Sequence, residues 1–164
     1  MFFIGWALSS LFVARLGDLI GRKKVFVAAL LLQVVTILTL INSTNLHLSM
    51  AGLFLMGVST AGRMSVGFFF LIEQVPKDSQ GKLSTSMAAF DATAMIWATI
   101  YFSYFSHNSV YWESFALLLT IVSLTFIAIF VPESPKFLYE KRMFREAREV
   151  LNYIADKNGI GIEV

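Results

Sequence analysis

Arg63 and Asp91 are the two ionisable residues of this chain that cannot be assigned to connections between apolar segments. Arg63 precedes Glu73 by ten residues, about 15 Å along a helix, and Asp91 follows Leu83 by eight, about 12 Å along the next. Consecutive antiparallel helices would bring both side chains to a similar depth, so we predict an Arg63–Asp91 ion pair. Such a pair could fix helix packing and register, or it could form a solute or proton site. Separate environments for the two residues are a third possibility.

Three further polar or aromatic residues within apolar segments are candidates for lining a cavity. Trp97 could stack on an organic cation, although packing against lipid or another helix is the commoner role. Tyr101 lies near the end of its segment, where aromatic side chains often anchor a helix at the membrane surface. Gln33 more often bonds a neighbouring helix than a solute. Each of these residues therefore has a structural interpretation beside the functional one.

No arrangement for catalysis or metal binding is visible in the sequence. The chain has no Cys, and its two histidines, His47 and His107, are far apart and away from carboxylate clusters. A glycine-rich phosphate loop and a nucleophile arrangement are also missing. We predict that the chain is not an enzyme and needs no metal or cofactor. Its net charge of +2 is too small to indicate a nucleic-acid partner.

Composition places these residues in a membrane protein. Of the 164 residues 57% are hydrophobic and 15% are charged, whereas a soluble domain carries roughly 25% charged residues. A membrane-spanning helix needs about 20 mostly apolar residues. The uncharged stretches and a polar break after residue 41 predict an all-α membrane protein with five transmembrane helices, at about residues 1–16, 25–41, 48–72, 83–105 and 111–131.

Basic residues alternate between the connections of these five segments. The first connection, the third connection and the tail contain Lys and Arg, and the second and fourth connections contain neither. Because cytoplasmic loops are enriched in basic residues, the N-terminus is predicted outside and the C-terminus in the cytoplasm. Residues 133–164 begin with Glu133, and Ser134-Pro135, which follows, is a typical helix start. Apolar residues at helical spacing predict a cytoplasmic amphipathic helix and tail there.

The first basic connection carries a recognisable motif. Residues 14–24 read Ala-Arg-Leu-Gly-Asp-Leu-Ile-Gly-Arg-Lys-Lys. Gly21 permits a tight turn, and Asp18 and Arg22 can make charge-assisted bonds to a neighbouring helix. This segment resembles the loop signature of the major facilitator superfamily. The matching residues are Leu16, Asp18, Gly21, Arg22 and Lys23, and the departures are Ala14 and Leu19.

Two more segments support the same resemblance. Residues 132–138 read Pro-Glu-Ser-Pro-Lys-Phe-Leu and are similar to the Pro-Glu-Ser-Pro-Arg sequence after the sixth helix of sugar porters and organic-ion transporters. Glu133 matches that sequence, while Lys136 keeps the charge of the usual Arg without its bidentate geometry. Glu73 stands where these transporters have a Glu, but the Arg-Gly pair that follows it in them is Gln80-Gly81 here.

The resemblance implies the N-terminal bundle of such a transporter, from its second to its sixth helix. It further implies secondary active or facilitative transport of a small organic solute by alternating access, with organic ions before sugars as the substrate class. H⁺ or Na⁺ would be the coupling ion, the plasma membrane the first location and an organelle membrane the second. The cytoplasmic residues would stabilise the outward-facing state: Asp18, Gly21, Arg22, Lys23, Glu73, Glu133 and Lys136.

A different class of function is also compatible with the sequence. The chain would then be a non-transporting remnant that serves as a structural subunit of a larger membrane complex. Both hypotheses imply the lipid bilayer as surroundings, together with either the missing remainder of a transporter or other membrane subunits as partners. The remnant hypothesis draws on the departures from the family pattern at Ala14, Leu19, Leu53 and Gln80.

Overall fold

The structure is a computed structural model that describes residues 1–157. Its regular secondary structure in this range is entirely helical, with no strand there, which confirms the predicted all-α class. The elements are α1 (Phe2–Ile20), α2 (Arg22–Asn42), α3 (Leu46–Ala61), the π-helical segment η1 (Gly62–Val66), α4 (Gly67–Glu73), α5 (Lys77–Ile100), the π-helical segment η2 (Tyr101–Phe105), α6 (Ser109–Phe130), α7 (Pro135–Glu140) and α8 (Phe144–Lys157).

Four helical stretches are long and apolar enough to cross a membrane. They are Phe2–Ile20, Arg22–Asn42, Leu46–Glu73 and Ser109–Phe130, and they correspond to the first, second, third and fifth predicted spans. The helix α5–η2 covers the fourth predicted span but is less apolar, because it carries Lys77, Asp78, Lys82 and Asp91 besides several Ser and Thr residues. Its crossing of the membrane stays a prediction.

The connection between α1 and α2 is shorter than the sequence predicts. Instead of a loop over residues 17–24, both helices extend until only Gly21 separates them. Gly21 has a φ of 124°, a conformation that residues with a Cβ rarely adopt. Its N–H donates to the Gly17 carbonyl, and its own carbonyl accepts the Val25 N–H. One glycine therefore reverses the chain and places the residues of the motif on two helix ends.

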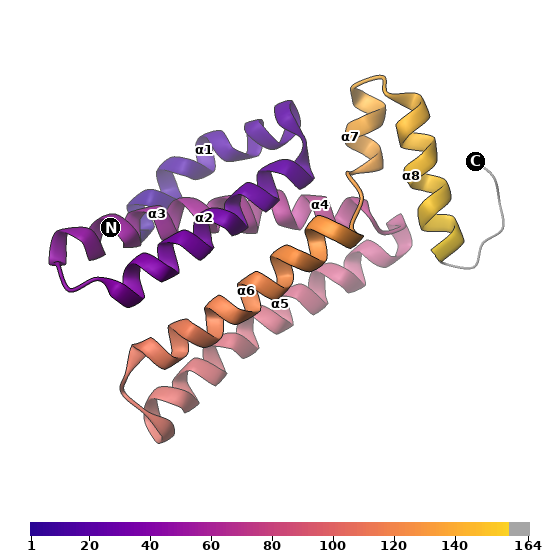
Figure 1. Cartoon of the computed structure of the whole chain (residues 1–164). Coiled ribbons are helices and arrows are strands. Elements are labelled where there is room, and N and C mark those ends of the chain that lie inside the picture. The colour runs from indigo at the N-terminus through magenta and orange to yellow at the C-terminus, as the bar shows by residue number, and fades with distance from the viewer. Residues whose placement is uncertain (158–164) are drawn as a thin grey trace.

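Helices α1, α2 and α3 form the tightest part of the bundle (Figure 1). Glycines allow α1 and α3 to approach closely. A Cβ added at Gly57 would lie 2.1 Å from the Phe2 carbonyl oxygen, and one added at Gly5 would lie 2.2 Å from that of Phe54. No other residue type fits at these two crossings.

An apolar cluster ties α2, α4 and α6 together near the charged end of the bundle. Phe26, Leu30 and Phe70 are buried there, and the Phe26 and Phe70 ring centroids lie 6.1 Å apart. Partly buried residues of α6 and of the chain just after it pack against this cluster, namely Leu124, Ile127 and Val131. The packing holds the end of α6 next to the ends of α2 and α4.

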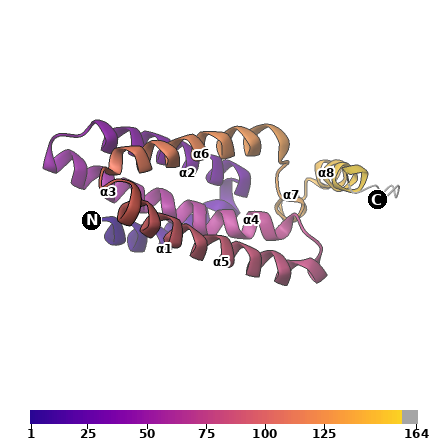
Figure 2. The same cartoon turned by 90° about the horizontal axis from the view of Figure 1, so that it is seen from below.

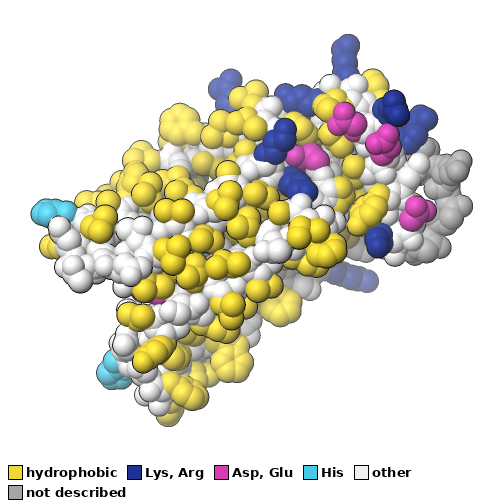
Figure 3. Space-filling view, viewed as in Figure 1, with side chains coloured by type: hydrophobic (Ala, Val, Ile, Leu, Met, Phe, Trp, Pro, Cys, Tyr) yellow, Lys and Arg dark blue, Asp and Glu magenta, His cyan; other side chains and the backbone are white. Residues whose placement is uncertain are grey.

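Helix α5 lies outside this core. It follows α4 through a short turn, and Figure 2 shows it diverging from α6 away from the η2 end; none of its residues is buried. At the far end, Tyr101 of η2 contacts Trp112 of α6, with ring centroids 5.4 Å apart. Hydrophobic side chains dominate the outer face of the bundle, and most charges on that face gather around α7, α8 and the adjoining helix ends (Figure 3). Such a surface is suited to lipid or to other helices.

The tail is a pair of helices rather than one amphipathic helix. Helix α7 ends in a turn in which Arg142 adopts a φ of 61° and the Met143 N–H donates to the Leu138 carbonyl at 2.9 Å. This pattern is a Schellman ending, which usually has Gly at the position of Arg142. Phe137, Leu138 and Ala147 form the core between α7 and α8. Residues 158–164 of the predicted tail lie outside the described residues.

Candidate functional site

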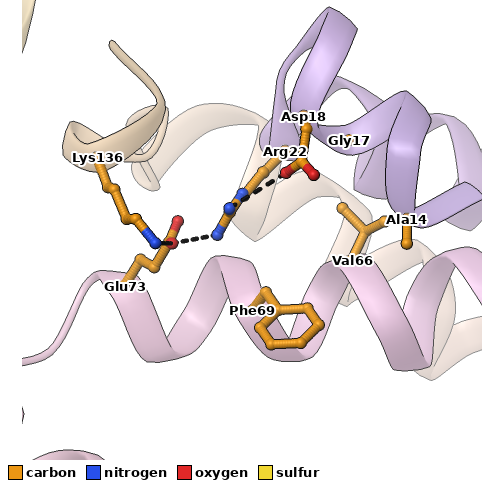
Figure 4. A pocket seen from close by; sticks show the side chains of 8 residues that line it. All are labelled: Ala14, Gly17, Asp18, Arg22, Val66, Phe69, Glu73 and Lys136. Atoms are coloured by element: carbon orange, nitrogen blue, oxygen red, sulfur yellow. Dashed lines mark hydrogen bonds and ion pairs between the residues drawn. The ribbon is translucent and has the colours of Figure 1, made fainter. Parts of the chain in front are cut away.

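The residues of the three motifs come together at one end of the bundle. We call Asp18, Arg22, Glu73, Glu133, Ser134 and Lys136 the Glu73 cluster. They come from the end of α1, the start of α2, the end of α4 and the start of α7 with the two residues before it; Figure 4 shows Asp18, Arg22, Glu73 and Lys136. The Gly21 turn and the packing of α4 on α2 bring these four helix ends together. The structure thus joins motifs that are more than a hundred residues apart in sequence.

Glu73 is the centre of the cluster. One of its oxygens forms an ion pair with the Arg22 guanidinium and lies 3.4 Å from the Lys136 ammonium. Its other oxygen accepts a hydrogen bond of 2.6 Å from the Ser134 hydroxyl. The Arg22 and Glu73 side chains are only 11% and 10% exposed, so their attraction is weakly screened by solvent. Asp18 contacts the other side of Arg22 at 3.2 Å.

Glu133 fills a second role in the cluster. Its Oε1 accepts the backbone N–H of Lys23 at 2.8 Å and that of Ser134 at 3.1 Å. Because helix N-termini carry free N–H groups and a partial positive charge, this carboxylate stabilises the start of α2. Gly21 is needed here as well, since a Cβ at that position would lie 2.7 Å from the other Glu133 oxygen. The Lys23 ammonium donates to the Ala128 carbonyl of α6 at 3.0 Å.

Ser134 makes one contact that the sequence predicted and one that it did not, and the contacts of Gln80 were not predicted. The fully buried Ser134 hydroxyl accepts the Phe137 N–H as the predicted N-cap of α7 and also donates to Glu73. The Gln80 amide donates to the Ile72 and Val75 carbonyls, both at 3.2 Å, at the end of α4. Gln80 stands where the family pattern has an Arg. Its neutral side chain makes these two hydrogen bonds to the end of α4 and to the turn that follows.

A cavity of about 540 Å³, including its open mouth, adjoins the cluster. Besides four residues of the cluster, Ala14, Gly17, Val66 and Phe69 line it (Figure 4). Acidic and basic groups here neutralise one another by direct contact. The arrangement is therefore suited to holding helix ends together, and a separation of those ends would require breaking several polar contacts at once.

The predicted ion pair between Arg63 and Asp91 is not formed. The ion pairs found within residues 1–157 involve other residues, and the Arg63 Nε atom is buried without a hydrogen-bond partner. The physical reason is that α5 is not packed closely on η1, so the exposed Asp91 stays out of contact.

The three candidate cavity residues have different environments. Gln33 is buried in the core, and its side-chain oxygen has no hydrogen-bond partner. Trp97 and Tyr101 line an apolar groove between α5 and α6, and the Tyr101 hydroxyl donates to the Asn108 carbonyl at 3.2 Å. A role for these residues in solute binding stays a prediction. Among the described residues no group of three His, Cys, Asp or Glu side chains could hold a metal ion.

A family model described as "Sugar (and other) transporter" matches residues 1–161. The chain belongs to this family. Its relatives include mouse solute carrier family 22 member 4, which is 29% identical over 163 residues. The glucose transporter GlcP of Staphylococcus epidermidis is 28% identical over 151 residues. The proton myo-inositol cotransporter hmit-1.1 of Caenorhabditis elegans is 29% identical over 166 residues. The predicted resemblance to the organic-ion and sugar-porter branch is confirmed.

This member of the sugar transporter family spans only part of its relatives. The three alignments cover 98%, 91% and 96% of the present chain but 29%, 34% and 27% of the relatives. The Glu73 cluster is contained within this matched region. Its contacts are therefore properties of one part of a transporter-like architecture.

Proposed function

We propose that this chain takes part in the transmembrane transport of a small organic solute by alternating access. The observation that carries the proposal is the Glu73 cluster, in which one carboxylate contacts both charged motifs of a chain that matches a transporter family over residues 1–161. Alternating access needs two arrangements of helices that can interconvert. The polar contacts of the Glu73 cluster stabilise one arrangement of the helix ends. They can be broken when the other arrangement forms, because they are not covalent.

In this mechanism the Glu73 cluster stabilises the outward-facing state. Arg22, Glu73 and Lys136 join the starts of α2 and α7 to the end of α4, while Glu133 caps α2 from the chain leading into α7. Because these contacts depend on several short distances at once, a modest separation of the helix ends would break them together. Binding energy from a solute would then offset their loss in the inward-facing state.

Organic ions are the first substrate class in this proposal and sugars the second. The names of the relatives include an organic cation transporter protein of Drosophila melanogaster as well as glucose and myo-inositol transporters. Coupling to H⁺ or Na⁺ belongs to the proposal, as do a plasma-membrane location and an outside N-terminus. The basic residues near Lys23 and in α8 support a cytoplasmic position for the end that carries the Glu73 cluster.

Uptake measurements test the proposal directly. The full-length gene product is reconstituted into vesicles, and uptake of labelled organic cations, zwitterions, anions and sugars is compared with that of empty vesicles. Saturable uptake of at least one solute is expected, with slower uptake when Arg22 and Glu73 are both replaced by Gln. A folded, inserted protein without uptake of any solute would contradict transport.

One observation favours the rival function of a structural subunit without transport. Gln80, in place of the usual Arg, bonds only backbone carbonyls of α4 and its following turn, so one arm of the charge network is neutral here. A structural subunit would resist dissociation from its membrane partners and show no uptake. Co-purification of a defined membrane complex, together with vesicles that take up no solute, would favour the structural-subunit function.

A further inference from the structure

The turn between α7 and α8 lies at the charged end of the bundle, close to the end of α6. Only residues 131–134 separate α6 from α7, and the Tyr153 hydroxyl of α8 donates to the Phe130 carbonyl of α6 at 3.5 Å. Both helices of the pair run crosswise to α6 in Figure 1, and α8 is seen nearly end-on in Figure 2. The pair therefore lies across the end of the bundle, with its turn at the edge of the molecule (Figure 1).

Large apolar side chains are exposed around this turn. Tyr139 of α7 is 67% exposed and Phe144 of α8 is 53% exposed, and Met143 between the two helices is also exposed. The Tyr139 and Phe144 rings contact each other edge to face, with centroids 5.1 Å apart. Aromatic side chains are enriched where a membrane protein meets the lipid headgroups. The turn thus presents an aromatic pair that the described chain leaves uncovered.

Three basic side chains flank the aromatic pair without an acidic partner. Lys141, Arg142 and Arg148 are exposed and form none of the ion pairs found within residues 1–157. The neighbouring Glu140 contacts Lys136 instead, at 4.0 Å. We call Tyr139, Lys141, Arg142, Met143, Phe144 and Arg148 the turn surface. Apolar side chains surrounded by cations are typical of protein surfaces that bind anionic membranes.

The acidic residues in the first half of α8 face the bundle rather than the turn surface. Glu146 and Glu149 line a cleft of about 870 Å³, including its open mouth, together with Lys23 of α2 and Phe130 of α6. Arg148 follows Glu146 by two residues, about 200° around the helix, and so lies on another side of α8. The charge of α8 is therefore divided between an acidic side toward the bundle and a basic side away from it.

Arg142 occupies the turn against its backbone preference. Its φ of 61° lies in the left-handed region that favours glycine. A Schellman ending usually has Gly at this position, and residues held in unfavourable conformations are often found at functional sites. No ion pair within residues 1–157 compensates for the cost. A binding partner outside the described chain would give the guanidinium a function.

We propose that the turn surface binds the anionic headgroups of the membrane leaflet beside it, with Tyr139 and Phe144 placed between the headgroups. The inference rests on the proposed transmembrane arrangement, in which this end of the bundle is cytoplasmic, because the cytoplasmic leaflet is the anionic one. The crosswise position of the helix pair places the turn over the lipid that surrounds the bundle. Each Lys or Arg near such a leaflet strengthens binding about fivefold.

Amide hydrogen exchange of the full-length protein in lipid nanodiscs tests the proposal. Nanodiscs of phosphatidylcholine are compared with nanodiscs in which phosphatidylserine replaces part of it, and the ratio of the two exchange rates is the lipid-dependent protection. At low salt, exchange at residues 139–148 should be at least about tenfold slower in the anionic nanodiscs. Most of this protection should disappear in about 1 M NaCl, where charges are screened beyond about 3 Å. Exchange in the core of α2 should be equal in both lipids.

The variant Arg142→Gly separates lipid binding from folding. It should raise the thermal stability in detergent, because glycine suits a φ of 61°, and yet lower the lipid-dependent protection about fivefold. Arg148→Gln should lower the protection by a similar factor with little change in stability. Phe144→Gln should reduce the protection that remains at high salt. The matched control Lys77→Gln, which removes an exposed base at the start of α5, should leave the protection at residues 139–148 unaltered.

Three outcomes would overturn the inference. Equal exchange in both kinds of nanodisc would refute lipid binding and leave the transport proposal untouched. Equal losses of protection in Lys77→Gln and Arg148→Gln would assign the effect to the general charge of this end of the bundle. Slow exchange at residues 139–148 in native membranes, without any effect of anionic nanodiscs, would indicate a protein partner instead. Since the exchange measurement needs no solute, an absence of uptake would count against transport alone.

Discussion

The Glu73 carboxylate offers the sharpest test of the Glu73 cluster. We consider Glu73→Gln, which preserves the shape of the side chain and an oxygen that can accept from the Ser134 hydroxyl. The change removes the negative charge that faces both Arg22 and Lys136. Its effect therefore measures the charge interactions of the cluster and leaves the packing almost unaltered.

The size of the effect follows from the exposure of the partners. Removing one partner of a buried ion pair costs about 3–5 kcal/mol, and Arg22 is only 11% exposed. Asp18 still contacts Arg22 at 3.2 Å and offsets part of this loss. Lys136 is 62% exposed, and such a surface pair contributes only about 0–1 kcal/mol. We expect a net loss of about 3 kcal/mol, which corresponds to roughly a 100-fold change in a local opening equilibrium.

Amide hydrogen exchange resolves this local opening. In Glu73→Gln, exchange in α7 and at the Lys23 amide, which Glu133 caps, should accelerate about 100-fold, while exchange in the core of α2 changes little. Lys136→Gln should accelerate exchange less than about tenfold. Glu149→Gln, which disturbs only an exposed pair on α8, should have almost no effect in α7. If Glu73→Gln accelerates amide exchange in α7 no more than Lys136→Gln does, the Glu73 carboxylate is not the main contact that holds these helix ends together.

Three further substitutions probe the backbone requirements of the fold, each read out by thermal unfolding in detergent. Gly21→Ala should destabilise by more than about 1 kcal/mol, because a Cβ is unfavourable at a φ of 124° and would meet a Glu133 oxygen at 2.7 Å; an unchanged midpoint would contradict this reason. Gly57→Ala should prevent close packing of α1 on α3, whereas Gly81→Ala, with open space around it, should be neutral or stabilise by up to about 1 kcal/mol; equal effects of both would refute the packing argument. Arg142→Gly should stabilise the α7–α8 turn by about 1 kcal/mol, since glycine adopts a φ of 61° without steric cost; destabilisation would show that the Arg142 side chain matters more than its backbone.

The helix class and the grouping of the charged motifs could be predicted from the sequence for definite physical reasons. Long uncharged stretches can satisfy their backbone in lipid only as helices or closed barrels. The residue types around Gly21 indicated a tight turn with charges beside it, and the structure has both. Ser134-Pro135 indicated a helix start, and Ser134 caps α7. These features depend on neighbours in sequence.

Features that depend on distant neighbours were missed or predicted wrongly. The second bond of Ser134, to Glu73, exists only because α4 ends beside α7. The break between α7 and α8 falls at Arg142 without a Gly or Pro to indicate it. The ion pair between Arg63 and Asp91 was inferred from depth alone, and depth does not determine how close two helices pack.

Helix α5 shows why the fourth predicted span is the most difficult to recognise by hydropathy. A helix surrounded by lipid must be apolar on all sides, as α6 largely is, and α6 meets the length and hydropathy expected of a span. Polar residues in a membrane helix are tolerated where they face a cavity or another protein surface. Helix α5 carries Asp91 and several hydroxyl side chains and leaves all its residues unburied. Its low hydropathy is therefore compatible with the proposed transport function, in which α5 would face a solute pathway, and its position between two apolar spans is the reason for predicting that it crosses the membrane.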